Sequence, residues 1–209
     1  MKLFGYFRST AAYRVRIALN YKELQYQHVG INLLQGEQHS DAYLALTPQG
    51  LVPILQMPDG TQISQSTAIL EWLEEVYPNP ALYPDDKLAR ATVRALTNTI
   101  ACDIHPLNNL RVLKYLVADL NVDEAQKIKW YQHWIALGFA GIEAQLTGTS
   151  YCLGDKVSMA DIYLIPQVYN ALRFNQDMDD FPKITSIYQN CNEFKAFKDS
   201  APEAQPDAK

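Results

Sequence analysis

The pattern of apolar and polar positions changes near residue 80. Before that point, short apolar runs alternate with stretches in which apolar residues recur at helical spacing. The pattern predicts strands over 2–6, 26–31, 52–57 and 61–63. It predicts helices over 11–21, 41–46 and 66–77, so that the order along the chain is βαβαββα. A βαβ unit followed by a hairpin predicts a small mixed sheet, parallel in its first pair of strands and antiparallel in its last.

After the proline-rich segment 77–86, the pattern is helical throughout. A long stretch over 88–117 is expected to kink at Pro106, since proline removes one helical hydrogen bond. Further helices begin at two capping sequences, Asp123 with Gln126 and Ser158 with Asp161, and a short one covers 183–194. The polar tail 201–209 is expected to fray. Segment 77–86 thus predicts a linker between an α/β domain, 1–80, and an all-α domain, 87–209.

Composition and charge exclude some classes of function but do not identify one. The chain has 209 residues, 48% of them hydrophobic and 20% charged, with a formal net charge of -5. This balance argues against a nucleic-acid partner, which needs a large cationic surface, but leaves room for a small cationic pocket. No apolar run approaches the roughly 20 residues of a membrane span, so no membrane partner is expected. The 3 cysteines form no CxxC pair, which indicates no metal site and reduced thiols in a cytoplasmic protein.

The first candidate for chemistry is the pair of hydroxyls at Ser9 and Thr10, where a helix follows a strand. A helix N-terminus carries partial positive charge and stabilises an anion. A thiolate bound there would accept a hydrogen bond from either hydroxyl, which would lower the pKa of its thiol. Simple helix capping explains this fragment better when it is taken alone.

Two further features follow in the same part of the chain. If the Val52-Pro53 bond is cis, the backbone of Val52 would face outward and pair with an extended peptide ligand. Pro53 removes a ladder donor, so a functional edge position and a plain edge strand explain it equally well. Gln65 and Ser66 begin another helix, suited to a ligand carboxylate or to ordinary capping. Such features together, in this order, are less expected by chance than any one of them.

On these residues the chain resembles the zeta-class glutathione transferases. Residues 9–19 read Ser-Thr-Ala-Ala-Tyr-Arg-Val-Arg-Ile-Ala-Leu, similar to the class signature Ser-Ser-Cys-x-(Trp/His)-Arg-Val-Arg-Ile-Ala-Leu. Further similar stretches lie at 47–53, 65–75, 105–113, 160–161 and 166–174. The resemblance implies the glutathione transferase fold, with an α/β thioredoxin-like N-terminal domain that binds glutathione and an all-α C-terminal domain that binds the substrate.

The resemblance also implies an activity. It is the glutathione-dependent cis–trans isomerisation of maleylacetoacetate to fumarylacetoacetate, by reversible addition of the glutathione thiolate to the double bond. Maleylpyruvate isomerisation and a conjugating or dehalogenating transferase remain alternatives, and a non-catalytic regulator ranks last. The implied cofactor is glutathione, the substrate a small dicarboxylate, and the assembly a cytoplasmic homodimer.

The same resemblance implies roles for individual residues. Ser9 is the expected hydrogen-bond donor to the thiolate, with Thr10 second and Tyr6 a rival. The residues expected to bind glutathione are Ser9, Thr10, Gln49, Val52, Gln65, Ser66, His105 and Asn109. Arg8 and Arg173, with Arg111 as a weaker choice, are expected to bind the substrate carboxylates because a guanidinium can hold an oxygen pair.

Two departures from the class signature matter for the chemistry. Thr10 keeps a hydroxyl where the family often has a second serine, whereas Ala11 replaces the family cysteine. Of the signature arginines Arg14 and Arg16, at most one is expected to face the site. Cys102 is expected to be a buried, inert thiol.

Overall fold

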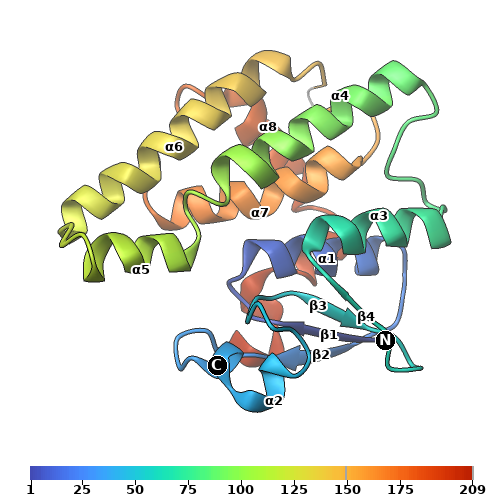
Figure 1. Ribbon diagram of the computed structural model, residues 1–209. Coiled ribbons are helices and arrows are strands. Elements are labelled where there is room, and N and C mark those ends of the chain that lie inside the picture. The colour runs from blue at the N-terminus through green and yellow to red at the C-terminus, as the bar shows by residue number, and fades with distance from the viewer. Residues whose placement is uncertain (149, 209) are drawn as a thin grey trace. The chain divides into compact units, whose positions relative to one another are not determined.

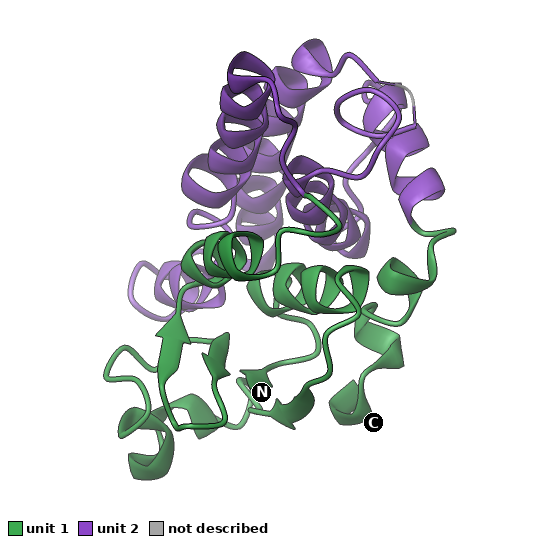
Figure 2. Cartoon of the chain, turned by 90° about the vertical axis from the view of Figure 1, so that its right-hand side faces the viewer, with its two compact units in different colours: residues 1–81, 192–209 green, residues 82–191 purple. Residues whose placement is uncertain are grey.

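The computed structural model describes residues 1–148 and 150–208, and its contacts divide the chain into two compact units (Figure 2). The first unit comprises residues 1–81 together with 192–209, and the second comprises residues 82–191. The sequence pattern had counted residues 192–209 with the helical domain, whereas the contacts group them with the sheet. No helix of the described residues has the length and apolarity that crossing a membrane requires.

The first unit is built on a mixed sheet with strand order β2-β1-β3-β4 (Figure 1). Its elements are β1 Lys2–Gly5, α1 Thr10–Tyr21, β2 Gln27–Gly30, η1 Glu37–His39, α2 Asp41–Leu44, β3 Ile54–Gln56, β4 Gln62–Ser64 and α3 Ser66–Val76. β1 pairs in parallel with β2 and antiparallel with β3, and β4 pairs antiparallel with β3. The predicted βαβ unit, hairpin and closing helix are thereby confirmed.

Helix α1 forms the core of this unit. Every residue of α1 from Thr10 to Leu19 is buried, and α1 packs against α3. At the other end of both helices, Lys22 is buried and its Nζ lies 2.8 Å from Glu74 Oε2, with bonds of 2.6 and 2.8 Å to the carbonyls of Tyr77 and Pro80. Lys22 therefore fixes the C-terminal end of α1 against the end of α3.

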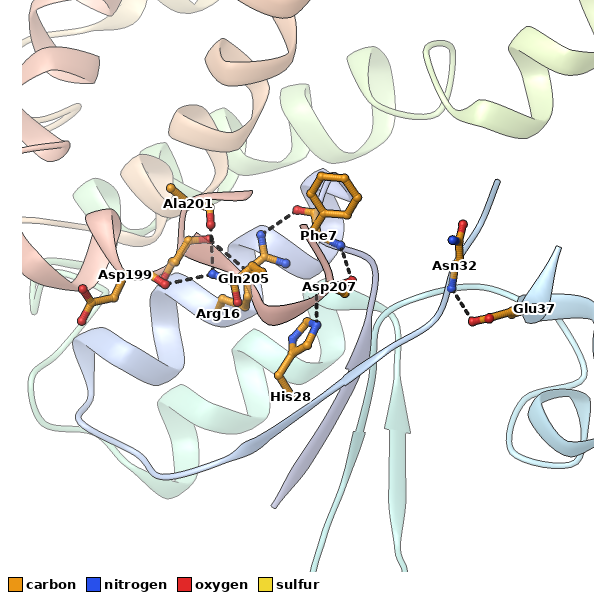
Figure 3. Close-up of polar contacts among 10 residues, drawn as sticks. Phe7, Arg16, His28, Asn32, Glu37, Asp199, Ala201, Gln205 and Asp207 are labelled. Atoms are coloured by element: carbon orange, nitrogen blue, oxygen red, sulfur yellow. Dashed lines mark hydrogen bonds and ion pairs between the residues drawn. The ribbon is translucent and has the colours of Figure 1, made fainter. Parts of the chain in front are cut away.

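The chain end completes the first unit and corrects a prediction. Residues 195–208 contain α9 Lys195–Lys198, η3 Pro202–Ala204 and η4 Pro206–Ala208, and α9 packs against α1. Pro202 and Gln205 are buried, and Gln205 Nε2 donates to the carbonyls of Asp199 and Ala201, both at 2.9 Å (Figure 3). The expectation of a fraying tail was wrong over residues 201–208, because the polar side chains that suggested solvation bond to the backbone.

The second unit is helical. Its elements are α4 Lys87–Asn98, the π-helical segment η2 Thr99–Ile104, α5 Leu110–Ala118, α6 Glu124–Gln145, α7 Met159–Arg173 and α8 Pro182–Cys191. The expected single kinked helix over 88–117 was wrong. The chain leaves the helix in a turn that contains Pro106, and Asn109 caps a new helix by accepting a hydrogen bond from Arg111 N at 3.1 Å.

Both capping sequences predicted in the second unit are confirmed. Asp123 accepts from Gln126 N at 2.8 Å on an exposed helix end. Asp161 is fully buried and accepts three hydrogen bonds, from Cys152 N at 2.8 Å and from Ser158 N and Oγ at 2.7 Å each. Burial raises the pKa of Asp161, and these donors oppose the increase. The Asp161 carboxyl thus joins the start of α7 to the preceding loop.

We expect Asp161→Ala to lower the free energy of unfolding by about 3 kcal/mol or more, because it leaves three buried donors without their acceptor. Asp123→Ala is the control, since it breaks the other capping box, at an exposed helix end, and should cost about 1 kcal/mol. Urea titrations of both variants provide the measurement. Equal losses in the two variants would contradict this account of Asp161.

Candidate functional site

The N-terminus of α1 is positioned by a tight turn. After β1 the chain turns through residues 6–9, and Ser9 N donates to Tyr6 O at 2.9 Å. Ser9 is the N-cap of α1, with extended backbone, and its Oγ accepts from Ala12 N at 3.2 Å. A hydroxyl that accepts through a lone pair retains its own proton for another acceptor. Capping by Ser9 and donation to a bound anion are therefore compatible.

The charges around this end of α1 favour an anion. The first turn of α1 contains no acidic residue, so the partial positive charge of the helix is not offset there. Ser9 is half-buried and Thr10 is buried. Arg8 is exposed, with its guanidinium carbon 4.8 Å from the centre of the Phe7 ring. Tyr6, the rival donor, is buried with its ring edge-on to Phe7.

The start of α3 differs from the sequence prediction. Gln65, not Ser66, is the N-cap, and it has φ 70° and ψ 118° with no side-chain cap bond. A non-glycine residue in such a conformation costs about 1–3 kcal/mol, which the surrounding structure must offset. The Gln65 side chain donates to Gln49 Oε1 at 3.2 Å, so two predicted ligand-binding residues meet at this helix end.

Arg14 and Arg16 are both fully buried on α1, at 1% and 0% exposure. They extend to different neighbours, as alternate positions of a helix require. Arg14 Nη1 lies 3.5 Å from Ser66 Oγ, and Arg16 Nη2 donates to Phe7 O at 2.9 Å. The sequence did not indicate which of the two faces the site, although the position of Arg14, four residues after Thr10, places both on one face of α1. Arg14 thereby connects the N-terminal halves of α1 and α3.

The loop before β3 contains Val52, whose backbone is predicted to pair with a peptide ligand. The Val52-Pro53 bond is cis. The plain edge-strand explanation of Pro53 was wrong, because Pro53 precedes β3 and β3 lies between β1 and β4. A functional role for this position stays a prediction. Tyr43 Oη donates to Leu51 O at 2.8 Å and holds the loop next to half-buried Val52.

Three predicted residues lie around the break that precedes α5. His105 is half-buried and its backbone N–H donates to Ile100 O at 2.9 Å. Asn109 caps α5 through its Oδ1, which leaves its amide N–H groups for other acceptors. Arg111 is exposed in the first turn of α5. All three belong to the second unit.

Arg173 is the last residue of α7 and is exposed. Its guanidinium carbon lies 4.8 Å from the centre of the Phe174 ring, which in turn stacks on Tyr131 at 3.9 Å between ring centres. The cation–π contact fixes the plane of the guanidinium while its outer nitrogens stay accessible. Arg173 therefore has a more defined orientation than Arg111.

No cysteine stands at the start of α1, where Ala11 occupies the position of the class cysteine. Cys152 and Cys191 are buried, and burial raises the pKa of both thiols, with the negative charge of Asp161 adding to the effect. The expectation that Cys102 is buried was wrong, since it is exposed in η2. Among the described residues, no three His, Cys, Asp or Glu side chains gather as a metal site would require.

Comparisons with known proteins agree with this fold. Residues 3–81 match the family model described as "Glutathione S-transferase, N-terminal domain", and residues 135–194 match "Glutathione S-transferase, C-terminal domain". A protein of Vibrio cholerae serotype O1 named "Probable maleylacetoacetate isomerase" is 48% identical over 99% of this chain and 97% of its own length.

Solved structures give the same result. The holo structure of a maleylpyruvate isomerase, described as a bacterial zeta-class glutathione S-transferase, has a TM-score of 0.97 at 44% identity and covers 100% of both chains. A maleylacetoacetate isomerase of Methylobacterium extorquens AM1, solved with malonate and glutathione bound, has a TM-score of 0.95 at 35% identity and also covers 100% of both chains.

The sheet unit that carries the candidate site, with the helical unit after it, is the architecture of a glutathione transferase, and the chain belongs to the glutathione S-transferase family. Within that family, its relatives assign it to the zeta class.

Proposed function

We propose that this chain is a glutathione-dependent cis–trans isomerase that converts maleylacetoacetate to fumarylacetoacetate. The observation that carries the proposal is the half-buried Ser9, which caps α1 through a lone pair and keeps its proton for an anion at a helix whose first turn contains no acidic residue. The similarity to isomerases along the whole chain supports the substrate class. Maleylpyruvate is the second candidate substrate, favoured by the relative with a TM-score of 0.97.

Bound glutathione supplies a thiolate that adds reversibly to a double bond, which permits rotation about the resulting single bond before the thiolate leaves. In this mechanism the Ser9 hydroxyl donates to the sulfur anion, and the partial positive charge of α1 stabilises the same charge. Thr10 is the second donor to consider. Because the hydroxyl and the helix end are preorganised, they stabilise the anion without reorganisation during the reaction.

The rest of the glutathione molecule fits the polar groups described above. The amide side chains of Gln49 and Gln65, which contact each other, can bind its polar ends, and Ser66 at the start of α3 suits a carboxylate. The backbone of Val52 would pair with the peptide. His105 and Asn109, which belong to the second unit, are proposed as glutathione ligands on the resemblance alone.

The substrate is a small dicarboxylate, so the proposal needs cationic groups to hold two carboxylates. Arg8 lies in the turn that leads to Ser9, and Arg173 presents a guanidinium that contacts the Phe174 ring. Arg111, exposed on α5, is the third and weaker choice. The malonate in the Methylobacterium extorquens relative is itself a dicarboxylate, which supports this substrate class. By the same resemblance we infer a homodimer that acts in the cytoplasm.

The first test follows the purified protein with each cis substrate, with and without glutathione. We expect isomerisation that requires glutathione and leaves the total glutathione pool unchanged, because the thiolate is regenerated in each turnover. Depletion of the pool would instead indicate a conjugating or dehalogenating transferase. Equal rates without added glutathione would contradict the proposal.

We expect Ser9→Ala to reduce kcat about 100-fold, because the sulfur anion loses a preorganised donor, with only a small change in the KM for glutathione. Ser9→Thr is the matched control, since it keeps both the hydroxyl and the cap. Steady-state kinetics on both variants, with Thr10→Val and Tyr6→Phe beside them, provide the measurement. An unchanged kcat in Ser9→Ala would move the role to whichever of the other two variants is impaired.

We expect Arg173→Ala to raise the KM for the dicarboxylate about 10-fold, since a hydrogen bond to a charged group contributes roughly 1.5–3 kcal/mol. Arg173→Lys, which keeps the charge but not the planar fork, should lie between the variant and the parent protein. Arg111→Ala is the control and should change KM less than twofold. A larger effect at Arg111 than at Arg173 would reverse this assignment.

A further inference from the structure

The end of the chain is bound to the elements that carry the candidate site. Ser200 is fully buried, its carbonyl accepts from Arg16 Nε at 2.9 Å, and its Oγ accepts from Asn20 Nδ2 at 2.7 Å. Both donors belong to α1, which Ser9 caps. Gln205 then folds the following residues through its bonds to the carbonyls of Asp199 and Ala201.

Asp207, near the chain end, contacts two other segments (Figure 3). Its Oδ2 accepts from Phe7 N at 3.0 Å, and its Oδ1 lies 2.8 Å from His28 Nε2 on β2. Gly30 makes room for this approach, since a Cβ at residue 30 would lie 2.9 Å from Asp207 Cβ. The contact with His28 thus orients the Asp207 carboxylate, and its other oxygen bonds to the backbone of Phe7.

Phe7 is therefore held at both of its backbone groups. Its N–H donates to Asp207 and its carbonyl accepts from Arg16 Nη2 (Figure 3). Phe7 lies within the turn closed by the bond from Ser9 N to Tyr6 O. Any rotation of the backbone at Phe7 moves the turn and, with it, the oxygen of Ser9. A single anchor at the carbonyl would still permit such rotation, whereas anchors on both groups restrict it.

We propose that Asp207 is a positioning residue for catalysis, which fixes the turn at Phe7 so that the Ser9 hydroxyl stays directed at the bound anion. The proposal rests on the function proposed above for Ser9. It adds a residue 200 positions along the chain from Phe7, which acts through the backbone of the turn. A displacement of about 1 Å at a reacting group can cost up to 100-fold in rate, so a small shift of this turn is sufficient for a measurable effect.

The test compares three variants of the full chain. Asp207→Ala removes both contacts, and Asp207→Asn keeps an oxygen that can accept from Phe7 N. Gln205→Ala is the matched control, because it removes two hydrogen bonds within the chain end but none to the turn. We expect kcat to fall about 10-fold in Asp207→Ala, with the KM for glutathione within about twofold, and to recover to within about threefold in Asp207→Asn. Gln205→Ala should stay within about twofold of the parent kcat.

A second route to the same effect leaves the carboxylate in place. Gly30→Ala introduces the Cβ that would press on Asp207, so it should displace the chain end and lower kcat as Asp207→Ala does. A parent-like kcat in Asp207→Ala would overturn the proposal, and so would an equal fall in Gln205→Ala. The latter result would mean that loosening the chain end in general, and not this carboxylate, impairs the enzyme.

A measurement that does not depend on enzyme activity distinguishes a failure of this proposal from a failure of the proposed function. Amide hydrogen exchange at Phe7, followed by NMR without any ligand, should be about 10-fold faster in Asp207→Ala, since the amide loses its acceptor. Unchanged exchange at Phe7 would overturn the positioning role. Loss of the proposed function would appear instead as a parent protein that does not isomerise either substrate with glutathione, whatever the exchange result.

Discussion

The arrangement around the candidate site depends on two guanidinium groups buried on one helix. A buried charge is tolerated only where it is hydrogen-bonded, so Arg14 and Arg16 restrict what can pack against α1. Arg14 reaches Ser66 at the start of α3, and Arg16 reaches both Phe7 O and Ser200 O. Three segments far apart in the sequence are thereby held against the same helix that Ser9 begins. The anion-stabilising end of α1 is thus part of a polar network inside a buried core.

The sheet unit was predictable because its apolar spacing reports burial directly. Leu3, Val15 and Leu55 are all fully buried, and each lies in an element that the periodicity had indicated. The break before α5 was not predicted, because a proline in a helical pattern can kink a helix or end it. The ordered chain end was missed for a different reason. Its structure comes from side chain to backbone bonds such as those of Gln205, which leave no periodic signal.

The candidate site, too, has features that the sequence predicted and features that it did not. The sequence indicated hydroxyls at the start of α1 but could not decide whether Ser9 caps the helix or binds an anion. The geometry removes that conflict, since the cap uses a lone pair and leaves the proton. The backbone of Gln65 at φ 70° could not be predicted, because nothing in a glutamine side chain favours that conformation. Its use there is consistent with a position that the fold fixes for binding.

The absence of the class cysteine bears directly on the proposed chemistry. Ala11 stands where the signature has a thiol, and Cys152 and Cys191 are held protonated by burial in the second unit. The field of a helix N-terminus stabilises a negative charge whatever molecule carries it, so α1 needs no thiol of its own. No cysteine lies in β1 or α1, so the sulfur nucleophile proposed at Ser9 is that of bound glutathione. Alanine in place of the class cysteine at residue 11 is therefore compatible with the proposed isomerisation.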